Sequence, residues 1–150
     1  MTAMETKTPE RTMYQACLMH SRAERVLKTI VAKHLKQYKI TRMEWIVIST
    51  LDAGSDKAGY TMSSLSKILD IKLSQLTILV TGTCKLGLSK QVTSPNDRRI
   101  KLVTITPKGK KLVDKTEQTM RTAMREWLSS IPRDKLSAYM QTLDMLGKIS

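Results

Sequence analysis

Apolar residues recur at three- and four-residue steps near both ends of the chain, which is the spacing of amphipathic helices. The first such pattern runs from Glu10 to Tyr38 without Gly or Pro. A second follows Thr106-Pro107, an N-cap with proline at the first helical position, and a third follows Pro132. These patterns predict a long N-terminal helix and two C-terminal helices. The apolar positions of the first are Met13, Ala16, Met19, Ala23, Leu27, Ile30, His34 and Tyr38.

The middle of the chain predicts three shorter helices. The capping box Thr41–Glu44 starts the first of them. The second spans 62–69, and the tight connection 70–72 leads to the third over 73–86, which Gly87 closes as its left-handed C-terminal residue. Two helices joined by so short a turn are typical of a helix-turn-helix. The expected inward residues are Leu65, Ile68 and Leu69, then Leu76, Leu79, Val80 and Thr83.

Two β-rich runs follow directly, at 88–94 and 100–106, and the turn 95–99 separates them. A hairpin after a helix-turn-helix forms a winged helix. We therefore expect a mainly α fold with about six helices and a two-stranded β-wing.

The net charge of the chain indicates what kind of partner it binds. Twenty-six Lys and Arg stand against thirteen Asp and Glu, a formal net charge of +13. Such an excess favours polyanions, although a merely soluble basic protein is the alternative. No apolar run approaches the ~18 residues of a membrane span, and no secretory signal is visible. Cys17 and Cys84 show no disulfide pattern, so we expect a cytoplasmic protein without a membrane partner.

The turn of the predicted wing carries two adjacent arginines. We expect Arg99 to enter a minor groove, Asp97 to aim it through a fork-like ion pair, and Arg98 to contact the DNA backbone. The alternative is a solvated turn with incidental charge. The position of Arg98 and Arg99 between a helix-turn-helix and further lysines favours the wing interpretation.

The predicted recognition helix, 73–86, has Lys85 as its only formal charge. Its outward residues would include Gln75, Ile78 and Gly82, a set suited to adenine edges and thymine methyl groups. This composition predicts a site rich in A·T pairs, and surface polarity without function is the alternative. The expected DNA-contacting residues are Ser63, Ser64, Lys72, Ser74, Gln75, Thr77, Ile78, Thr81, Arg98, Arg99 and Lys101.

The terminal helices hold more apolar surface than one winged helix needs to close its core. We therefore expect a single domain over 1–150, in which 10–40 and 107–150 form a homodimer and 41–106 is the DNA-binding lobe. An intramolecular bundle is the alternative. The sequence contains no catalytic motif and no zinc-ligand spacing, so we expect no enzyme activity, no cofactor and no metal.

The stretch from Asp97 to Gly109, DRRIKLVTITPKG, resembles the wing signature D-R-R-x-x-x-V-x-L-T-x-x-G of the MarR (multiple antibiotic resistance regulator) family, with Ile105 in place of Leu. Gly87-Leu88 is similar to that family's entry to the wing. The resemblance covers the chain from Glu10 onward. It implies an obligate dimer on inverted-repeat operators and repression relieved by a signal, such as a small aromatic or phenolic effector or an oxidant. It also implies an effector pocket between the dimer helices and the DNA-binding lobe, for which the candidate residues are Cys17, His20, Trp45 and Ile48.

The chain departs from that family at several positions. Ile78 and Gly82 stand where basic residues are common, so the wing should carry more of the binding. Cys17 has the spacing of the peroxide-sensing branch, but Ser21 and Val31 lack the phenol groups of that branch's tyrosine partners. Two alternatives to an effector-controlled repressor stay open, an architectural nucleic-acid binder without an effector and a thiol-based sensor acting through Cys17, for which a buried structural thiol is the simpler interpretation.

Overall fold

The computed structural model describes residues 9–54 and 58–148, and the chain divides into two compact units. The first unit extends to Thr116 and the second begins at Glu117. The boundary lies inside helix α5 (Pro107–Trp127), so the first unit contains more than the expected 41–106 lobe.

The first unit begins with α1 (Pro9–Leu35), which ends in a 3-10 turn, η1 (Lys36–Tyr38). The sequence pattern predicted one helix through Tyr38, but the last turn tightens and Lys39 then takes a left-handed φ of 56°. Apolar residues near the end of α1, Val31 and Leu35, are buried. Those nearer its start are exposed, among them Met13, Tyr14, Met19, Val26 and Leu27.

Helix α2 (Arg42–Ala53) begins at the predicted capping box. The side chain of Thr41 accepts a hydrogen bond from the Glu44 amide at 3.2 Å, and Glu44 Oε2 accepts one from the Thr41 amide at 2.8 Å. Both bonds satisfy amides that would otherwise lack a partner at the start of the helix.

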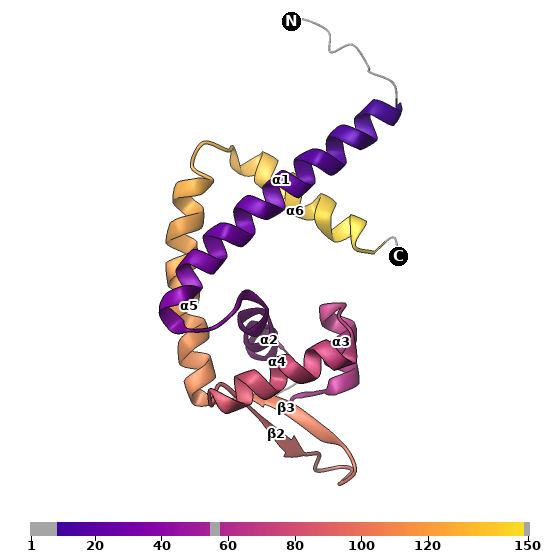
Figure 1. Cartoon of the computed structure of the whole chain (residues 1–150), viewed down its shortest axis with the longest axis vertical. Helices are drawn as coiled ribbons and strands as arrows, with labels where there is room; N and C mark the ends of the chain where they lie inside the picture. The colour runs from indigo at the N-terminus through magenta and orange to yellow at the C-terminus, as the bar shows by residue number, and fades with distance from the viewer. Residues whose placement is uncertain (1–8, 55–57, 149–150) are drawn as a thin grey trace, which may run out of the picture. The chain divides into compact units, whose positions relative to one another are not determined.

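Helices α3 (Met62–Leu69) and α4 (Leu73–Lys85) form the helix-turn-helix (Figure 1). Asp70 makes the turn with a φ of 49°. Most of the expected inward residues are buried or half-buried, but Ile68 is 54% exposed and does not belong to the core. The buried cluster that joins these helices to α2 and to the sheet consists of Val47, Leu51, Leu65, Leu76, Val80 and Val103.

The sheet has three strands within the described residues, where the sequence predicted two. The wing strands β2 (Ser89–Thr93) and β3 (Lys101–Ile105) pair antiparallel, as expected. The two-residue strand β1 (Tyr60–Thr61) pairs with the other edge of β3, giving the order β1-β3-β2. A strand of two residues is too short to show an alternating pattern, so its sequence was indistinguishable from that of a loop.

The second unit contains the rest of α5 and helix α6 (Arg133–Leu146). The break around Pro132 is where the sequence predicted it. No residue of α6 is buried within the described chain. The large exposed apolar side chains of this unit are Trp127, Ile131, Tyr139, Met140, Met145 and Leu146.

Candidate nucleic-acid interface and an adjoining pocket

The outward face of α4 carries small polar groups around one apolar side chain. Ile78 is 73% exposed, although an isoleucine normally lies in a core. Ser74, Gln75, Thr77 and Thr81 are exposed on the same helix. The hydroxyl of Thr77 donates to the Leu73 carbonyl at 2.8 Å, so toward DNA it offers a methyl group and an acceptor rather than a donor. The face has hydrogen-bonding groups and an apolar contact, but no charge to bind phosphate strongly.

Gly82 does not face outward, as the sequence pattern had suggested. It is half-buried, and a Cβ built on it would lie 2.6 Å from Glu44 Oε1. The missing side chain therefore permits α4 to approach the start of α2. Gly82 therefore lies outside the DNA-facing surface and serves the packing of α4 on α2.

The start of α3 offers one free serine hydroxyl rather than two. Ser63 is exposed. Ser64 is half-buried, and its hydroxyl donates to the Thr61 carbonyl at 3.0 Å while it accepts from the Thr61 hydroxyl at 2.9 Å. Ser64 has thus used its only hydrogen within the cap, so it contributes to the interface by fixing the N-terminus of α3. Lys72 is exposed. It is the N-cap residue of α4 and lies in the short connection between α3 and α4.

The wing tip is ordered by backbone and side-chain hydrogen bonds. Asp97 Oδ1 accepts a bond from the Arg99 amide at 2.9 Å, and the Ile100 amide donates to the Asp97 carbonyl at 3.0 Å. The expected fork-like pair between Asp97 and the Arg99 guanidinium is absent from the described ion pairs, so that expectation is wrong. Asp97 shapes the turn through the main chain, and both arginine side chains remain exposed.

Lys101 lies on the wing opposite Thr93, and its ammonium donates to the Thr93 hydroxyl at 2.7 Å. This cross-strand bond holds the lysine along the hairpin. The wing, the hairpin that extends past α4 in Figure 1, therefore presents four exposed cations. They are Lys90 on β2, Arg98 and Arg99 in the turn, and Lys101 on β3.

The end of α4 is fastened to the start of α5. Gly87 takes a φ of 71°, the Leu88 amide donates to the Thr83 carbonyl at 2.9 Å, and the Gly87 amide donates to the Cys84 carbonyl at 2.9 Å, which is a Schellman motif. The Thr106 hydroxyl donates to the Gly87 carbonyl at 2.6 Å, and the Lys108 ammonium donates to the Leu86 carbonyl at 2.7 Å. We call this set of bonds the α4–α5 junction.

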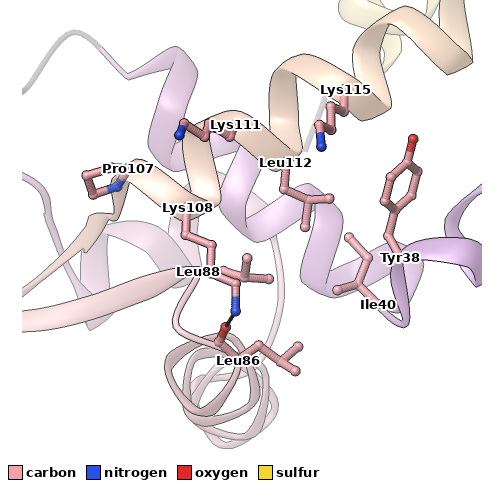
Figure 2. A pocket seen from close by; sticks show the side chains of 9 residues that line it. All are labelled: Tyr38, Ile40, Leu86, Leu88, Pro107, Lys108, Lys111, Leu112 and Lys115. Carbon is pink, nitrogen blue, oxygen red and sulfur yellow. Dashed lines mark hydrogen bonds between the residues drawn. The ribbon is translucent and has the colours of Figure 1, made fainter.

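A pocket of about 470 Å³ adjoins the junction within the first unit. Figure 2 shows Leu112 pointing from α5 toward Leu86 and Leu88, with Ile40 and Tyr38 at one end and three lysines along the α5 side. Its lining consists of Tyr38, Ile40, Leu86, Leu88, Pro107, Lys108, Lys111, Leu112 and Lys115. The sequence patterns did not predict this pocket. The visible signal was the spacing of Lys108, Lys111 and Lys115, which places all three on one face of a helix.

The four residues that the family resemblance suggested for an effector pocket lie elsewhere. Ile48 is fully buried, and the indole of Trp45 donates to the Thr116 hydroxyl at 3.0 Å. Cys17 is exposed on α1, contrary to the buried structural thiol, and His20 is exposed as well. That these four residues together form an effector site stays a prediction. Cys84 is half-buried against the core, as expected of a packing residue.

Two other kinds of site are absent from the part of the chain that the structure describes. Within residues 9–54 and 58–148 no helix is long and apolar enough to cross a membrane. No group of three or more His, Cys, Asp or Glu side chains in the same ranges could hold a metal ion.

Solved structures with this fold are distantly related to the chain in sequence. A MarR-family transcriptional regulator from Rhodococcus sp. RHA1 aligns with a TM-score of 0.81 and 18% identity over 97% of this chain and 100% of its own. A cysteine-to-serine mutant of MarR from E. coli, complexed with operator DNA, aligns with a TM-score of 0.79 and 18% identity over 93% of this chain and 99% of its own. CouR from Rhodococcus jostii RHA1, bound to p-coumaroyl-CoA, aligns with a TM-score of 0.78 and 21% identity over 88% of this chain and 91% of its own.

No protein-family model matches the sequence. At such identities the structural likeness establishes the fold alone. The chain therefore has the winged-helix fold of the MarR family of transcriptional regulators.

Proposed function

We propose that the chain is a MarR-type regulator of transcription that binds duplex DNA sequence-specifically as a homodimer, and that it represses until a small-molecule effector releases it. The observation that carries the proposal is the pairing of two exposed surfaces. An uncharged α4 face with Gln75 and Ile78 suits base edges, and the wing beside it carries exposed Arg98 and Arg99.

The two surfaces have different tasks in this account. Phosphate contacts from the wing, Ser63 and Lys72 give affinity and fix the register of the protein on DNA. The α4 side chains then discriminate bases by hydrogen bonds and by apolar contact with thymine methyl groups. Because α4 adds little charge, the wing supplies most of the electrostatic affinity for DNA. A regulator of this kind needs no catalytic group, so the proposal excludes an enzyme.

Dimerisation is supported by the exposed apolar side chains at both ends of the chain. Met13 and Met19 on α1 and Met140 on α6 are 66%, 67% and 64% exposed. This exposure does not stabilise a monomer in water. A partner copy that buried the same apolar surface would stabilise the dimer by roughly 25 cal/mol per Å². A two-fold dimer would also present two copies of α4, which fits an inverted-repeat operator.

The ligands bound to structures of the same fold support the two kinds of ligand that we propose. One structure of the same fold is a complex with operator DNA, and another contains p-coumaroyl-CoA. Both classes of ligand, duplex DNA and a small organic molecule, are proposals for this chain.

The direct test is a comparison of two duplexes at one salt concentration. One contains a palindromic A·T-rich site with half-sites a helical turn apart, selected from a random library with the intact protein, and the other is random in sequence. We expect the selected site to bind at least about a thousandfold tighter. A ratio below about tenfold would contradict a sequence-specific regulator.

One observation favours a second candidate, an architectural nucleic-acid binder. The net charge of +13 supports binding to any duplex. The α4 face around Gln75 and Ile78 has no Arg or Lys, the side chains that most strongly read guanine, and the one charge of α4, Lys85, lies in its last turn. The same comparison separates the candidates, because an architectural protein would bind both duplexes with similar affinity and similar salt dependence.

A further inference from the structure

We propose that a second pocket, lined by the end of α2, by strand β3 and by the start of α5, binds a small zwitterion: an ammonium and a carboxylate on a short aliphatic body, as in a free amino acid. The cavity measures about 300 Å³ and lies wholly within the first unit. This volume is at the lower end of the range of small-molecule sites, ~300–1,000 Å³. The pocket shares no lining residue with the one at the α4–α5 junction, and the proposed binding does not depend on the function in DNA binding.

The pocket exists because β1 is shorter than the strand that it pairs with. The pairing of β1 ends at Val103, whereas β3 continues through Thr104 to Ile105. Thr104 and Ile105 pair with β2 on their other side. Beyond the end of β1, Gly54 and Gly59 line the pocket and bring no side chain into it. A small ligand can therefore reach this part of the sheet edge.

Two opposite charges line the cavity without pairing with each other. Asp52 is half-buried near the end of α2, and Lys110 is exposed in the first turn of α5. The three described ion pairs each join residues four apart on one helix, and neither of these charges takes part in them. Within the described chain neither side chain has a hydrogen bond. A zwitterion can pair with both charges at once, whereas Asp52 would repel a simple anion and Lys110 a simple cation.

The hydroxyl of Thr104 is the third polar group of the site. Its Oγ1 is buried and has no hydrogen-bond partner among the described residues. A buried hydroxyl without a partner destabilises the fold, and most such groups in proteins are hydrogen-bonded. Because Thr104 lines the pocket, a charged group of a bound ligand can supply the partner. Three polar groups without partners therefore border one cavity, which is typical of a ligand site rather than of a packing defect.

The apolar part of the lining sets the body of the ligand. Leu51 and Val103 are buried, and Ile105 is half-buried. All three belong to the core cluster or pack against it, so this wall of the pocket is fixed by the fold. A short branched alkyl group on the ligand would contact these side chains and lose its own contact with water.

The test of the ligand class uses matched probes on the full-length protein. Leucine carries both charges, 3-methylbutylamine is the same molecule without the carboxylate, and 4-methylpentanoate is the same molecule without the ammonium. Glycine keeps both charges and lacks the aliphatic body. In isothermal titration calorimetry we expect leucine to bind at least about tenfold more tightly than each of the other probes. No binding of leucine, or equal binding of leucine and a probe with one charge, would overturn the zwitterion site.

The assignment of the two charges predicts that each substitution removes one preference only. In Asp52→Asn, leucine should lose its advantage over 4-methylpentanoate and keep its advantage over 3-methylbutylamine, and Lys110→Gln should do the reverse. The controls Asp114→Asn and Lys67→Gln remove exposed charges outside both pocket linings and should leave the affinities unchanged. Loss of both preferences in one variant, or equal effects of the controls, would contradict the assignment.

Thr104→Val separates ligand binding from the stability of the fold. The substitution replaces a hydroxyl without a partner by a methyl group of similar size, so we expect the free energy of unfolding in urea to be unchanged or higher. The affinity for leucine should nevertheless fall by about threefold or more, because one hydrogen bond to the ligand is lost. An unchanged affinity, or a clear loss of stability, would overturn the role of Thr104 in the site.

Discussion

Asp97 orients the wing tip through a hydrogen bond to a main-chain amide. Its role there does not depend on its negative charge. Its Oδ1 accepts from the Arg99 amide at 2.9 Å. An asparagine could make the same bond without the negative charge. We expect Asp97→Asn to bind duplex DNA as tightly as the natural protein or more tightly, and Asp97→Ala to bind more weakly by about 1 kcal/mol.

Fluorescence anisotropy with a labelled duplex would compare the two Asp97 variants at one salt concentration. The prediction is contradicted if Asn and Ala weaken binding equally, since that result would assign the effect to the lost charge. Circular dichroism of both variants provides the control for folding.

Arg98 and Arg99 should differ in what they contribute. Arg99→Ala is expected to cost about 1–3 kcal/mol and to reduce the preference for A·T pairs at the position of the wing. Arg98→Ala should weaken binding to all sequences and lower the slope of log affinity against log salt by about one. Salt titrations on two duplexes that differ only under the wing would measure both effects. Identical behaviour of the two variants would contradict the division of roles.

At the scale of elements, the contact between α2 and α4 depends on a missing side chain. A Cβ on Gly82 would lie 2.6 Å from Glu44 Oε1 and displace the carboxylate that completes the capping box at Thr41. We expect Gly82→Ala to leave the free energy of unfolding nearly unchanged, because the loss of the cap, typically about 1 kcal/mol, offsets a gain in helix propensity of about the same size. In a Glu44→Ala background the same change should instead stabilise, because alanine is the better helix former by about 1 kcal/mol.

Urea unfolding of the four proteins in this double-mutant cycle would give the coupling energy. Additive effects of the two substitutions would show that Gly82 and Glu44 do not interact. The exposed helix position Thr81→Ala, one residue away, serves as a control for helix propensity alone.

Local signals predicted most of the elements. Capping at Thr41 and glycine at 87 each fix a helix end through hydrogen bonds between near neighbours, and proline at 107 favours a helix start because its φ is fixed and it has no amide to leave without a partner. The structure contains all three. Contacts between distant segments were not visible. The strand pairing of Tyr60 with Val103, the approach of Gly82 to Glu44 and the pocket at the α4–α5 junction each depend on how elements pack. No periodic pattern within one segment encodes them.

At the scale of the whole molecule, the apolar side chains of the terminal helices predict a dimer in solution. Met140 is 64% exposed on α6. We expect Met140→Glu to weaken self-association, since a carboxylate in a dimer interface would lose its hydration. Gln141→Glu adds the same charge at the next position of the helix and should have a smaller effect. Analytical ultracentrifugation of the three proteins would measure the change, and a natural protein that is a folded monomer at micromolar concentration would refute the dimer.

The net charge of +13 makes binding a strong function of ionic strength under either candidate function. If a dimer neutralises ~8 phosphates, the slope of log affinity against log salt is about −7. Salt dependence therefore tests the extent of phosphate contact, but it does not distinguish a specific regulator from an architectural binder.

The most direct test of the proposed function is the affinity of the intact protein for a selected inverted-repeat duplex against random duplex, both at about 150 mM salt. A dimeric regulator should prefer the selected site at least about a thousandfold, with half-sites one helical turn apart and A·T pairs under α4 and the wing. Affinities that agree within about tenfold, or a selected site without two-fold symmetry, would contradict a dimeric regulator that reads DNA through the uncharged face of α4 and a basic wing.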